Sequence, residues 1–348
     1  MSRVRLVLFS FVPAVLLFVI LEGGLRVAGF RHEAAPIVLR FGYPEPSEIT
    51  GLFRPDADLF WRLRPGSTFD AEAPVSINAA GYRGPGARDP RPPDVARVAV
   101  MGDSVAFGFG TAWPDLLHHW LAALFPERTV EVLNFGVPGY SVVQGVRQFD
   151  ADVADLKPDV VLIAYGWNDH WLARGGLPDA ERRLPSGFVT QVVEKLARLR
   201  TVQAVHRLIG AGDDPPSTTS PVRRVPEDVF WERVRELIEK ARAGGAEPIV
   251  IGLPAGFDER SAPAYLVDSG FTPTARDAVR DHERYVELAR GAAEATGATF
   301  VDLRPVFAIA GGSLFSGDLV HPSARGHALI ATHLAEPTAR AIAGREIP

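Results

Sequence analysis

Serine, histidine and aspartate occur in this 348-residue sequence in a pattern that suits acyl transfer. Ser104 lies three residues after the end of a short apolar run, and Asp318 lies three residues before His321 near the other end of the chain. A serine hydroxyl is a weak nucleophile, so it needs a base within hydrogen-bond reach, and the base needs an acceptor that orients its other ring nitrogen. His321 fits the role of the base and Asp318 that of the acceptor. The three residues therefore predict a nucleophilic serine site.

Two further residues are candidates for stabilising the oxyanion that forms when a serine attacks a carbonyl. The N–H of Ser104 lies where a strand is expected to turn into a helix, and the positive helix end favours negative charge there. Gly139 can bring a second backbone N–H close because it has no side chain. Asn168 offers a side-chain amide. Each residue alone also fits a helix cap or a turn, so the prediction of an oxyanion hole rests on their joint occurrence.

The elements that must position these residues alternate between apolar strands and longer helical segments after residue 93. This alternation indicates a doubly wound parallel sheet, because parallel strands need long crossovers that cover both faces. Ligands bind such sheets beyond the carboxyl ends of the strands, where the candidate residues fall. The predicted strands are 97–101, 130–135, 159–165, 247–253 and 299–303, and the predicted helices are 113–124, 142–156, 188–207, 226–243, 276–295 and 323–342.

Four blocks at these positions resemble those of the SGNH hydrolases, also called the GDSL esterase and lipase superfamily. The resemblance implies a flavodoxin-like three-layer αβα sandwich with a five-stranded parallel sheet. It further implies Ser104 as nucleophile, Asp318 and His321 as the rest of a triad, and the Ser104 amide with Gly139 and Asn168 as the oxyanion hole. It extends over about residues 97–343, and its blocks are Gly102-Asp103-Ser104 with Gly108, residues 134–141, Gly166-Trp167-Asn168-Asp169, and Asp318-Leu319-Val320-His321.

The resemblance implies an esterase that works through an acyl-enzyme and needs no cofactor or metal. Small esters or acylated carbohydrates of the cell envelope are the expected substrates. With a sugar hydroxyl as acceptor the same triad would make an O-acyltransferase, and a non-catalytic, membrane-tethered carbohydrate-binding module is a further alternative. Trp167 and Trp171 are candidates for stacking on a sugar ring, with packing in the core as the alternative.

The first 30 residues are predicted to anchor the chain in a lipid bilayer. Arg3 and Arg5 precede an almost unbroken apolar run over residues 6–21, which is somewhat short for a transmembrane helix of about 20 residues. The positive N-terminal flank favours a cytoplasmic N-terminus. We therefore expect a single-pass protein with an extracytoplasmic catalytic domain, and a cleaved signal peptide with a secreted protein is the alternative.

Composition and turn residues define the remaining organisation. Residues 31–93 are rich in Pro and Gly and predict an extended lead-in with short strands at 59–63 and 75–78, followed by an SGNH hydrolase domain over 94–348. Residues 210–226 predict an exposed loop.

A net charge of −5 makes nucleic acid an improbable partner, and the absence of cysteine excludes disulfides and thiol nucleophiles. Nothing in the sequence indicates the oligomeric state.

Overall fold

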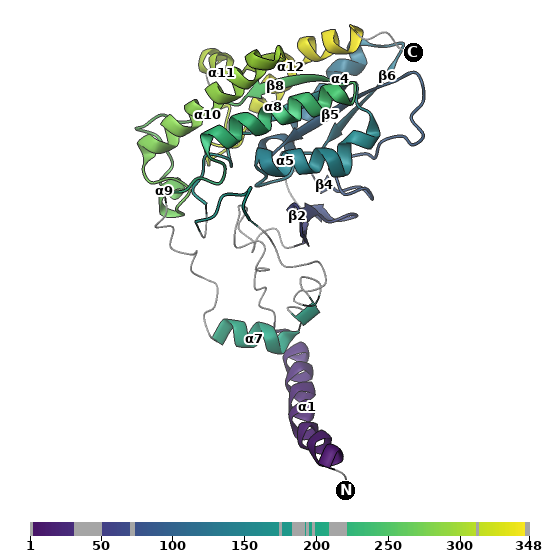
Figure 1. Cartoon of the computed structure of the whole chain (residues 1–348), viewed down its shortest axis with the longest axis vertical. Coiled ribbons are helices and arrows are strands. Elements are labelled where there is room, and N and C mark those ends of the chain that lie inside the picture. Colours follow the sequence, from purple (N-terminus) through teal and green to yellow (C-terminus); the bar gives the residue numbers. More distant parts are fainter. Residues whose placement is uncertain are drawn as a thin grey trace.

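The centre of the computed structural model is a five-stranded parallel sheet with helices on both faces (Figure 1). Numbered along the chain, its strands lie in the order 2-1-3-4-5, which is the flavodoxin-like order. The predicted α/β fold is confirmed. The structure describes residues 3–30, 51–69, 74–173, 176–182, 192, 195–196, 199–208, 221–310 and 313–344. The sheet consists of β6 (Thr129–Asn134), β5 (Val95–Gly102), β7 (Val160–Ala164), β8 (Glu247–Gly252) and β9 (Thr299–Asp302).

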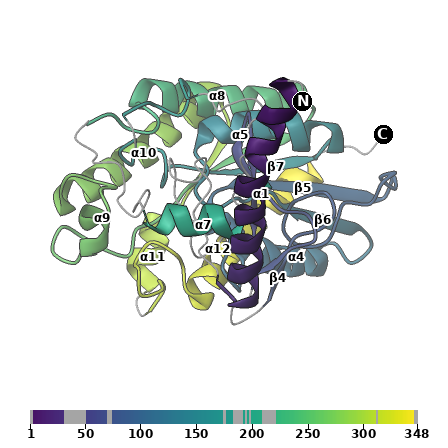
Figure 2. The same cartoon turned by 90° about the horizontal axis from the view of Figure 1, so that it is seen from below.

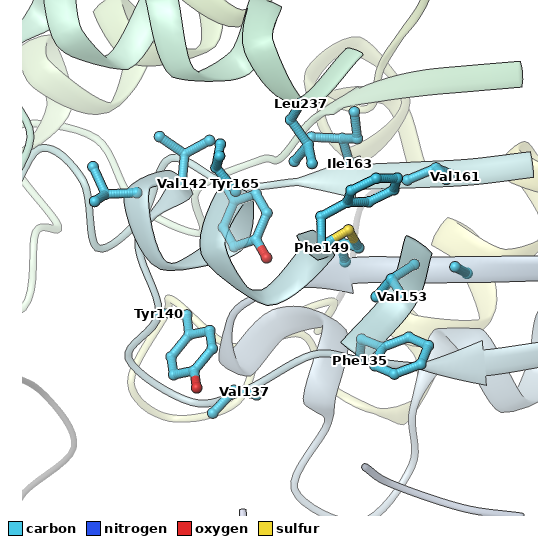
Figure 3. Packing of buried hydrophobic residues seen from close by; sticks show 14 of the residues in the cluster. Phe135, Val137, Tyr140, Val142, Phe149, Val153, Val161, Ile163, Tyr165 and Leu237 are labelled. Carbon is cyan, nitrogen blue, oxygen red and sulfur yellow. The ribbon is translucent and has the colours of Figure 1, made fainter. Parts of the chain in front are cut away.

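Alternate residues of the central strands point into two hydrophobic clusters, one on each face of the sheet. On β5, Ala99 and Met101 belong to one cluster, whereas Val98 and Val100 belong to the other. Successive strand side chains point to opposite faces, and every residue of β5 is buried. The unbroken apolar run in the sequence is therefore the consequence of a strand held between two helical layers. Figure 3 shows part of the first cluster, including Phe135, Phe149, Val161, Ile163 and Leu237.

The helices begin and end near the predicted residues, because local capping signals define them. Ser141 and Gln144 form a capping box at the start of α5, and Thr274 and Ser323 cap two later helices. The predicted helix 142–156 is α-helical only at first and continues as a π-helical and a 3-10 turn. The helices of this domain are α3 (Ser104–Phe107), α4 (Trp113–Leu124), α5 (Val142–Gln148), α8 (Glu227–Ala243), α9 (Ala264–Asp268), α10 (Ala275–Thr296), α11 (Arg304–Ala310) and α12 (Ala324–Ala343).

The described part of the lead-in, residues 51–69 and 74–93, packs against the sheet domain. It forms two small antiparallel hairpins that contain the two predicted short strands. Leu59, Trp61 and Leu63 are almost completely buried and belong to the same cluster as Met101 of β5. This part of the lead-in is thus folded onto the domain rather than extended. The hairpin strands are β1 (Phe53–Asp56), β2 (Phe60–Leu63), β3 (Thr68–Phe69) and β4 (Val75–Ser76).

Helix α1 (Arg3–Val27) points away from the sheet domain (Figure 1). Helix α7 (Arg200–Leu208) lies across the C-terminal end of α1 (Figures 1 and 2). The Glu22 carboxylate joins the two helices, because it accepts hydrogen bonds from the backbone N–H groups of Arg200 (3.0 Å) and Thr201 (2.9 Å). Within the described ranges, no helix has the length and apolar character needed to cross a membrane.

Two sequence predictions around α7 have mixed outcomes. The predicted helix 188–207 is observed at its end as α7, while most of its earlier residues lie outside the described part of the chain. The predicted loop 210–226 lies outside it up to residue 220. Its last residues contradict the prediction of exposure, because Arg224 and Val225 are buried. Their burial has a clear cause: Arg224 pairs with Asp179 inside the protein.

Candidate active site

The serine and histidine that the sequence singled out are in direct contact. Ser104 follows β5, and the His321 Nε2 lies 2.8 Å from its Oγ. The other ring nitrogen, Nδ1, lies 2.5 Å from Asp318 Oδ2. Ser104 and His321 are 217 positions apart in the chain. They meet because both lie on loops at the carboxyl ends of parallel strands. Strand β5 has β6 on one side and β7 on the other, so Ser104 also lies at the switch point of the strand order, where such sheets bind ligands.

Ser104 is held by a tight turn between β5 and α3. Asp103 caps this short helix, and its Oδ1 accepts the Val105 N–H at 2.9 Å. Burial raises the pKa of Asp103 to about 6, although that hydrogen bond and the charge of His321 oppose the shift. Gly108 ends α3 with a φ of 68°, in the left-handed region that glycine adopts without strain. The backbone itself thus fixes the position of the hydroxyl.

Asp318 is organised as an acceptor before any substrate binds. Its Oδ1 accepts hydrogen bonds from the Val320 N–H (3.0 Å), the His321 N–H (2.9 Å) and the Ser316 hydroxyl (2.8 Å), which leaves Oδ2 for the imidazole. Partial burial raises the pKa of this carboxyl, but the hydrogen bonds and the charge of His321 outweigh burial and hold the pKa well below its usual range. Asp318 therefore remains ionised and fixes the orientation of the His321 ring.

The predicted oxyanion donors lie on neighbouring loops that Asn168 ties together. Gly139 has a φ of 83° in the turn after β6. Asn168 is buried, and its Nδ2 donates to Asp103 Oδ2 (3.2 Å) and to the Tyr140 carbonyl (3.1 Å). The amide thus connects the Ser104 turn with the Gly139 turn. Both N–H groups of the amide already have a hydrogen-bond partner, so Asn168 could donate to an oxyanion only by sharing or exchanging one of these bonds.

A cavity of about 640 Å³ opens beside the serine and the histidine. The loop after Ser104 forms one wall and the start of α12 forms another. Phe109 meets the His321 ring edge-on with centroids 5.4 Å apart. Burial lowers the pKa of His327 to about 3, so this wall presents a neutral imidazole. The remaining lining residues include Gly108, Gly110, Thr111, Ser316, Pro322, Ser323 and Ala324.

Comparison with known proteins identifies the family. A model of the GDSL-like Lipase/Acylhydrolase family matches residues 100–329, which is more than half of the chain. The chain belongs to this family. The lipases and acylhydrolases after which this family is described are enzymes that hydrolyse ester bonds. The matched region contains Ser104, Gly139, Asn168 and the Asp318–His321 pair, whereas the lead-in hairpins lie outside it.

Three individual comparisons give only distant similarity to this chain. An acetylxylan esterase from Geobacillus stearothermophilus is 32% identical over 78 residues, which are 22% of this chain and 36% of that protein. The match thus spans little more than a third of that relative. A lipase/acylhydrolase from Enterococcus faecalis has 18% identity and a TM-score of 0.47, over 70% of this chain and 95% of that chain. A structure of an acetylxylan esterase from Geobacillus stearothermophilus has 21% identity and a TM-score of 0.45, over 72% and 95%.

Trp167 and Trp171 are not positioned to stack on a sugar in the acylhydrolase, so this prediction was wrong. Their side chains are only 2% and 4% exposed, respectively. The Trp167 indole stacks on His282 with centroids 4.0 Å apart, and Trp171 packs on Phe271 at 4.2 Å. Apolar rings that follow a central strand are drawn into the core between sheet and helices. Phe109, by contrast, lines the cavity.

Two buried arginines that the sequence analysis did not identify hold the loops of the acylhydrolase site. Arg83, from the lead-in, donates to the carbonyls of Phe107 (2.5 Å) and Gly110 (2.6 Å) in the loop that lines the cavity. Arg224 donates to the Gly139 carbonyl (2.8 Å) and pairs with Asp179. Both arginines lie among residues typical of turns, so the sequence does not indicate that their side chains are buried. Among the residues that the structure describes, no cluster of three His, Asp or Glu side chains could hold a metal ion.

Proposed function

We propose that the protein is a serine esterase in which Ser104 attacks the ester carbonyl. His321 removes the hydroxyl proton as the C–O bond forms, and then donates it to the leaving alcohol, which leaves an acyl-enzyme. Water then gives a proton to the same imidazole and attacks the acyl carbonyl; the bond from the acyl carbon to Ser104 Oγ breaks, His321 returns the proton to Oγ, and the carboxylic acid leaves. The observation that carries this proposal is the continuous chain of contacts from Ser104 Oγ through His321 to Asp318.

The N–H groups of Ser104 and Gly139 and the amide of Asn168 stabilise the oxyanion in this mechanism. Each lies on a loop at the carboxyl end of a strand, and Asn168 is within hydrogen-bond distance of residues on both neighbouring loops. Removal of a single oxyanion donor typically costs about 10²- to 10³-fold in kcat. Asp318 contributes by holding His321 in the tautomer whose Nε2 is free to accept the serine proton.

An active-site label tests the nucleophile. We expect a fluorophosphonate probe to attach covalently to the wild-type protein and to lose its target in Ser104→Ala. Ser261→Ala is the matched control, because Ser261 is exposed and hydrogen-bonds only within its own loop; it should label like the wild type. Equal labelling of Ser104→Ala and wild type would reject Ser104, and absence of labelling together with glycan binding would favour the non-catalytic binding module.

We propose an acylated carbohydrate as the substrate. The cavity beside Ser104 combines one half-buried aromatic ring, Phe109, with the hydroxyl groups of Thr111 and Ser323 and the neutral His327 imidazole. Aromatic rings and hydroxyl groups are suitable contacts for the faces and edges of a sugar. The likeness of a short segment to an acetylxylan esterase supports the same class of substrate.

Acyl release from acetylated oligosaccharides tests the substrate class. We expect acetate release from such glycans, and we expect Phe109→Ala to raise KM for the glycan more than KM for p-nitrophenyl acetate, which has no sugar to contact. Equal changes for both substrates would contradict a sugar site at Phe109. Acyl transfer to an added oligosaccharide in preference to water would identify an O-acyltransferase.

We also propose that residues 1–30 anchor the protein in a bilayer, with the catalytic domain outside the cytoplasm. Apolar side chains on α1 from Val12 to Leu21 are largely exposed; Val15 and Ile20, for example, are 59% and 67% exposed. Exposed apolar surface of this kind is costly in water and favours lipid. Membrane sedimentation of the full chain, lost in a variant lacking residues 1–30, is the expected result; a shortened chain in the medium would instead indicate signal cleavage.

A further inference from the structure

Three successive backbone carbonyls in the turn after β6 each accept a hydrogen bond from a buried side chain. The three donors come from widely separated parts of the chain: the lead-in hairpin, the segment before α8 and the loop after β7. A turn that is restrained at three consecutive peptide groups cannot rotate one of them without breaking a buried hydrogen bond. The bonds run from Trp61 Nε1 to Pro138 (3.1 Å), from Arg224 Nη1 to Gly139 (2.8 Å) and from Asn168 Nδ2 to Tyr140 (3.1 Å).

The bond from Trp61 acts on the peptide group that carries the proposed oxyanion donor. The Pro138 carbonyl and the Gly139 N–H belong to one planar trans peptide, so they point in opposite directions. Because the Trp61 indole fixes the direction of the carbonyl, it also fixes the direction of the N–H. A hydrogen bond accepted by the carbonyl polarises the same peptide and makes its N–H a stronger donor. We infer that Trp61 is a positioning residue for the Gly139 donor, which extends the proposed esterase mechanism and rests on it.

Trp61 is itself firmly held, as a positioning residue must be. Its side chain is 1% exposed. Its carbonyl accepts the Tyr140 hydroxyl at 2.5 Å, and the two rings meet edge-on with centroids 5.8 Å apart. The neighbouring Leu59 carbonyl accepts the Gln144 side chain at 2.8 Å, and Arg62 pairs with Asp152. The β1–β2 hairpin and the segment that follows β6 are therefore bound reciprocally.

Through Trp61, the lead-in takes part in catalysis although it lies outside the region that the family model matches. The family match begins at residue 100, whereas Trp61 lies in β2. The negative charge on the oxygen exists only after attack, so a better aligned N–H stabilises the transition state more than the bound ester. Loss of the Trp61 hydrogen bond should therefore lower kcat and leave KM nearly unchanged.

The test removes the indole N–H and keeps an aromatic ring. In Trp61→Phe we expect kcat for p-nitrophenyl acetate to fall about 5- to 30-fold, which is less than the ~10²- to 10³-fold loss when a donor itself is removed. Trp113→Phe is the matched control: Trp113 is equally buried, but its indole N–H has no partner in the described part of the chain. It should lose stability through the smaller ring without a comparable loss of kcat.

A second variant separates hydrogen bonding from packing. The variant carries at position 61 a tryptophan analogue in which sulfur replaces the indole N–H. This analogue keeps the volume of the ring and removes only the donor, so it tests the role of the hydrogen bond even if Trp61→Phe folds poorly. A fall in kcat at constant KM in this variant supports the inference. A kcat within twofold of the wild type, or equal losses in Trp61→Phe and Trp113→Phe, overturns it. A wild-type protein that neither hydrolyses the ester nor reacts with the fluorophosphonate would instead refute the proposed function itself.

Discussion

At the scale of single residues, the site depends on hydrogen bonds that exist before substrate arrives. Asp318 has its Oδ1 saturated by three donors, so only Oδ2 faces the imidazole. His321 is therefore held between a fixed carboxylate and the Ser104 hydroxyl. Preorganisation of this kind avoids the cost of reorienting dipoles during the reaction.

Asp318→Asn should lower kcat by about 10³- to 10⁴-fold, because an amide can present its N–H₂ to His321 and select the wrong ring tautomer. Steady-state hydrolysis of p-nitrophenyl acetate measures the effect. Asp258→Asn is the control, since Asp258 is an exposed carboxylate bound only within its own loop. A loss smaller than tenfold in Asp318→Asn would show that the carboxylate does not orient the base.

Asp169→Asn should change how stability depends on pH. Burial raises the pKa of Asp169 to about 7, compared with about 3.9 in an unfolded chain. The protonated carboxyl thus stabilises the fold below pH 4, and this contribution is lost as the pH rises through 7. The variant does not titrate, so between pH 5 and pH 8 its melting temperature should fall less, or rise more, than that of the wild type.

Calorimetry of both proteins across this range measures the difference. The Asp169 carboxylate accepts hydrogen bonds from the N–H groups of Val142 and Gly166. The amide of Asp169→Asn has only one oxygen and therefore loses one of these two bonds, which lowers the melting temperature by a similar amount at each pH. Asp258→Asn should follow the wild type, because hydrogen bonds lower the pKa of Asp258 and it stays ionised in this range. If the melting temperatures of Asp169→Asn and wild type changed equally with pH, the raised pKa of Asp169 would be contradicted.

At the scale of elements, the position of Ser104 depends on how closely α3 packs on the turn after β6. A Cβ at Gly136 would lie 2.5 Å from the Phe107 nitrogen and 2.8 Å from the Ala106 carbonyl carbon. Both atoms belong to the backbone of the helix that begins with Ser104, so they cannot move independently. The glycine is therefore required by the close approach of two loops that carry active-site residues.

Gly136→Ala should lower both stability and activity. Overpacking of this kind typically costs about 1–3 kcal/mol, and the shift of α3 should also move the Ser104 hydroxyl away from His321. Urea unfolding and ester hydrolysis measure the two effects. Gly51→Ala is the control, because no atom of the described residues lies within 4 Å of a Cβ at that position. Unchanged unfolding free energy in Gly136→Ala would show that the contact relaxes easily.

At the scale of the whole molecule, the catalytic unit extends beyond the family match on its N-terminal side. The β1–β2 hairpin contributes Leu59, Phe60, Trp61 and Leu63 to the core, each at most 2% exposed. Trp61 of this hairpin and Arg83, which follows β4, donate hydrogen bonds to the loops of the proposed active site. The segment between the N-terminal helix and the family match is therefore a structural part of the enzyme and more than a connection.

Two truncations test this extension. A variant that starts at Gly51 should fold and keep esterase activity, whereas one that starts at Ser67 should not fold stably. Each large apolar side chain contributes about 1.5–3 kcal/mol when fully buried, so four of them rival the total stability of ~5–15 kcal/mol of an ordinary domain. Circular dichroism and hydrolysis of p-nitrophenyl acetate give the answer. Equal stability of the two variants would mean that the hairpin is dispensable.

The sequence by itself determined the order of the five sheet strands and of the long helices between them, and it predicted which serine, histidine and aspartate would come together. Apolar runs such as residues 97–101 are strong signals, because a strand between two helical layers must be hydrophobic on both faces. The block that contains Ser104 and the block of Asp318 and His321 carry their chemistry in residue type and local spacing. Parallel topology then implied that they meet, since all strands deliver their carboxyl ends to one edge of the sheet.

Only the tertiary structure decided which side chains surround that site. It buried Trp167 and Trp171 and placed Phe109 at the cavity, because exposure depends on how the layers close over a loop. It also brought Trp61 and Arg224 onto the turn that contains Gly139. These contacts join segments far apart in the chain, and neither periodicity nor a local motif encodes a hydrogen bond to a distant backbone carbonyl.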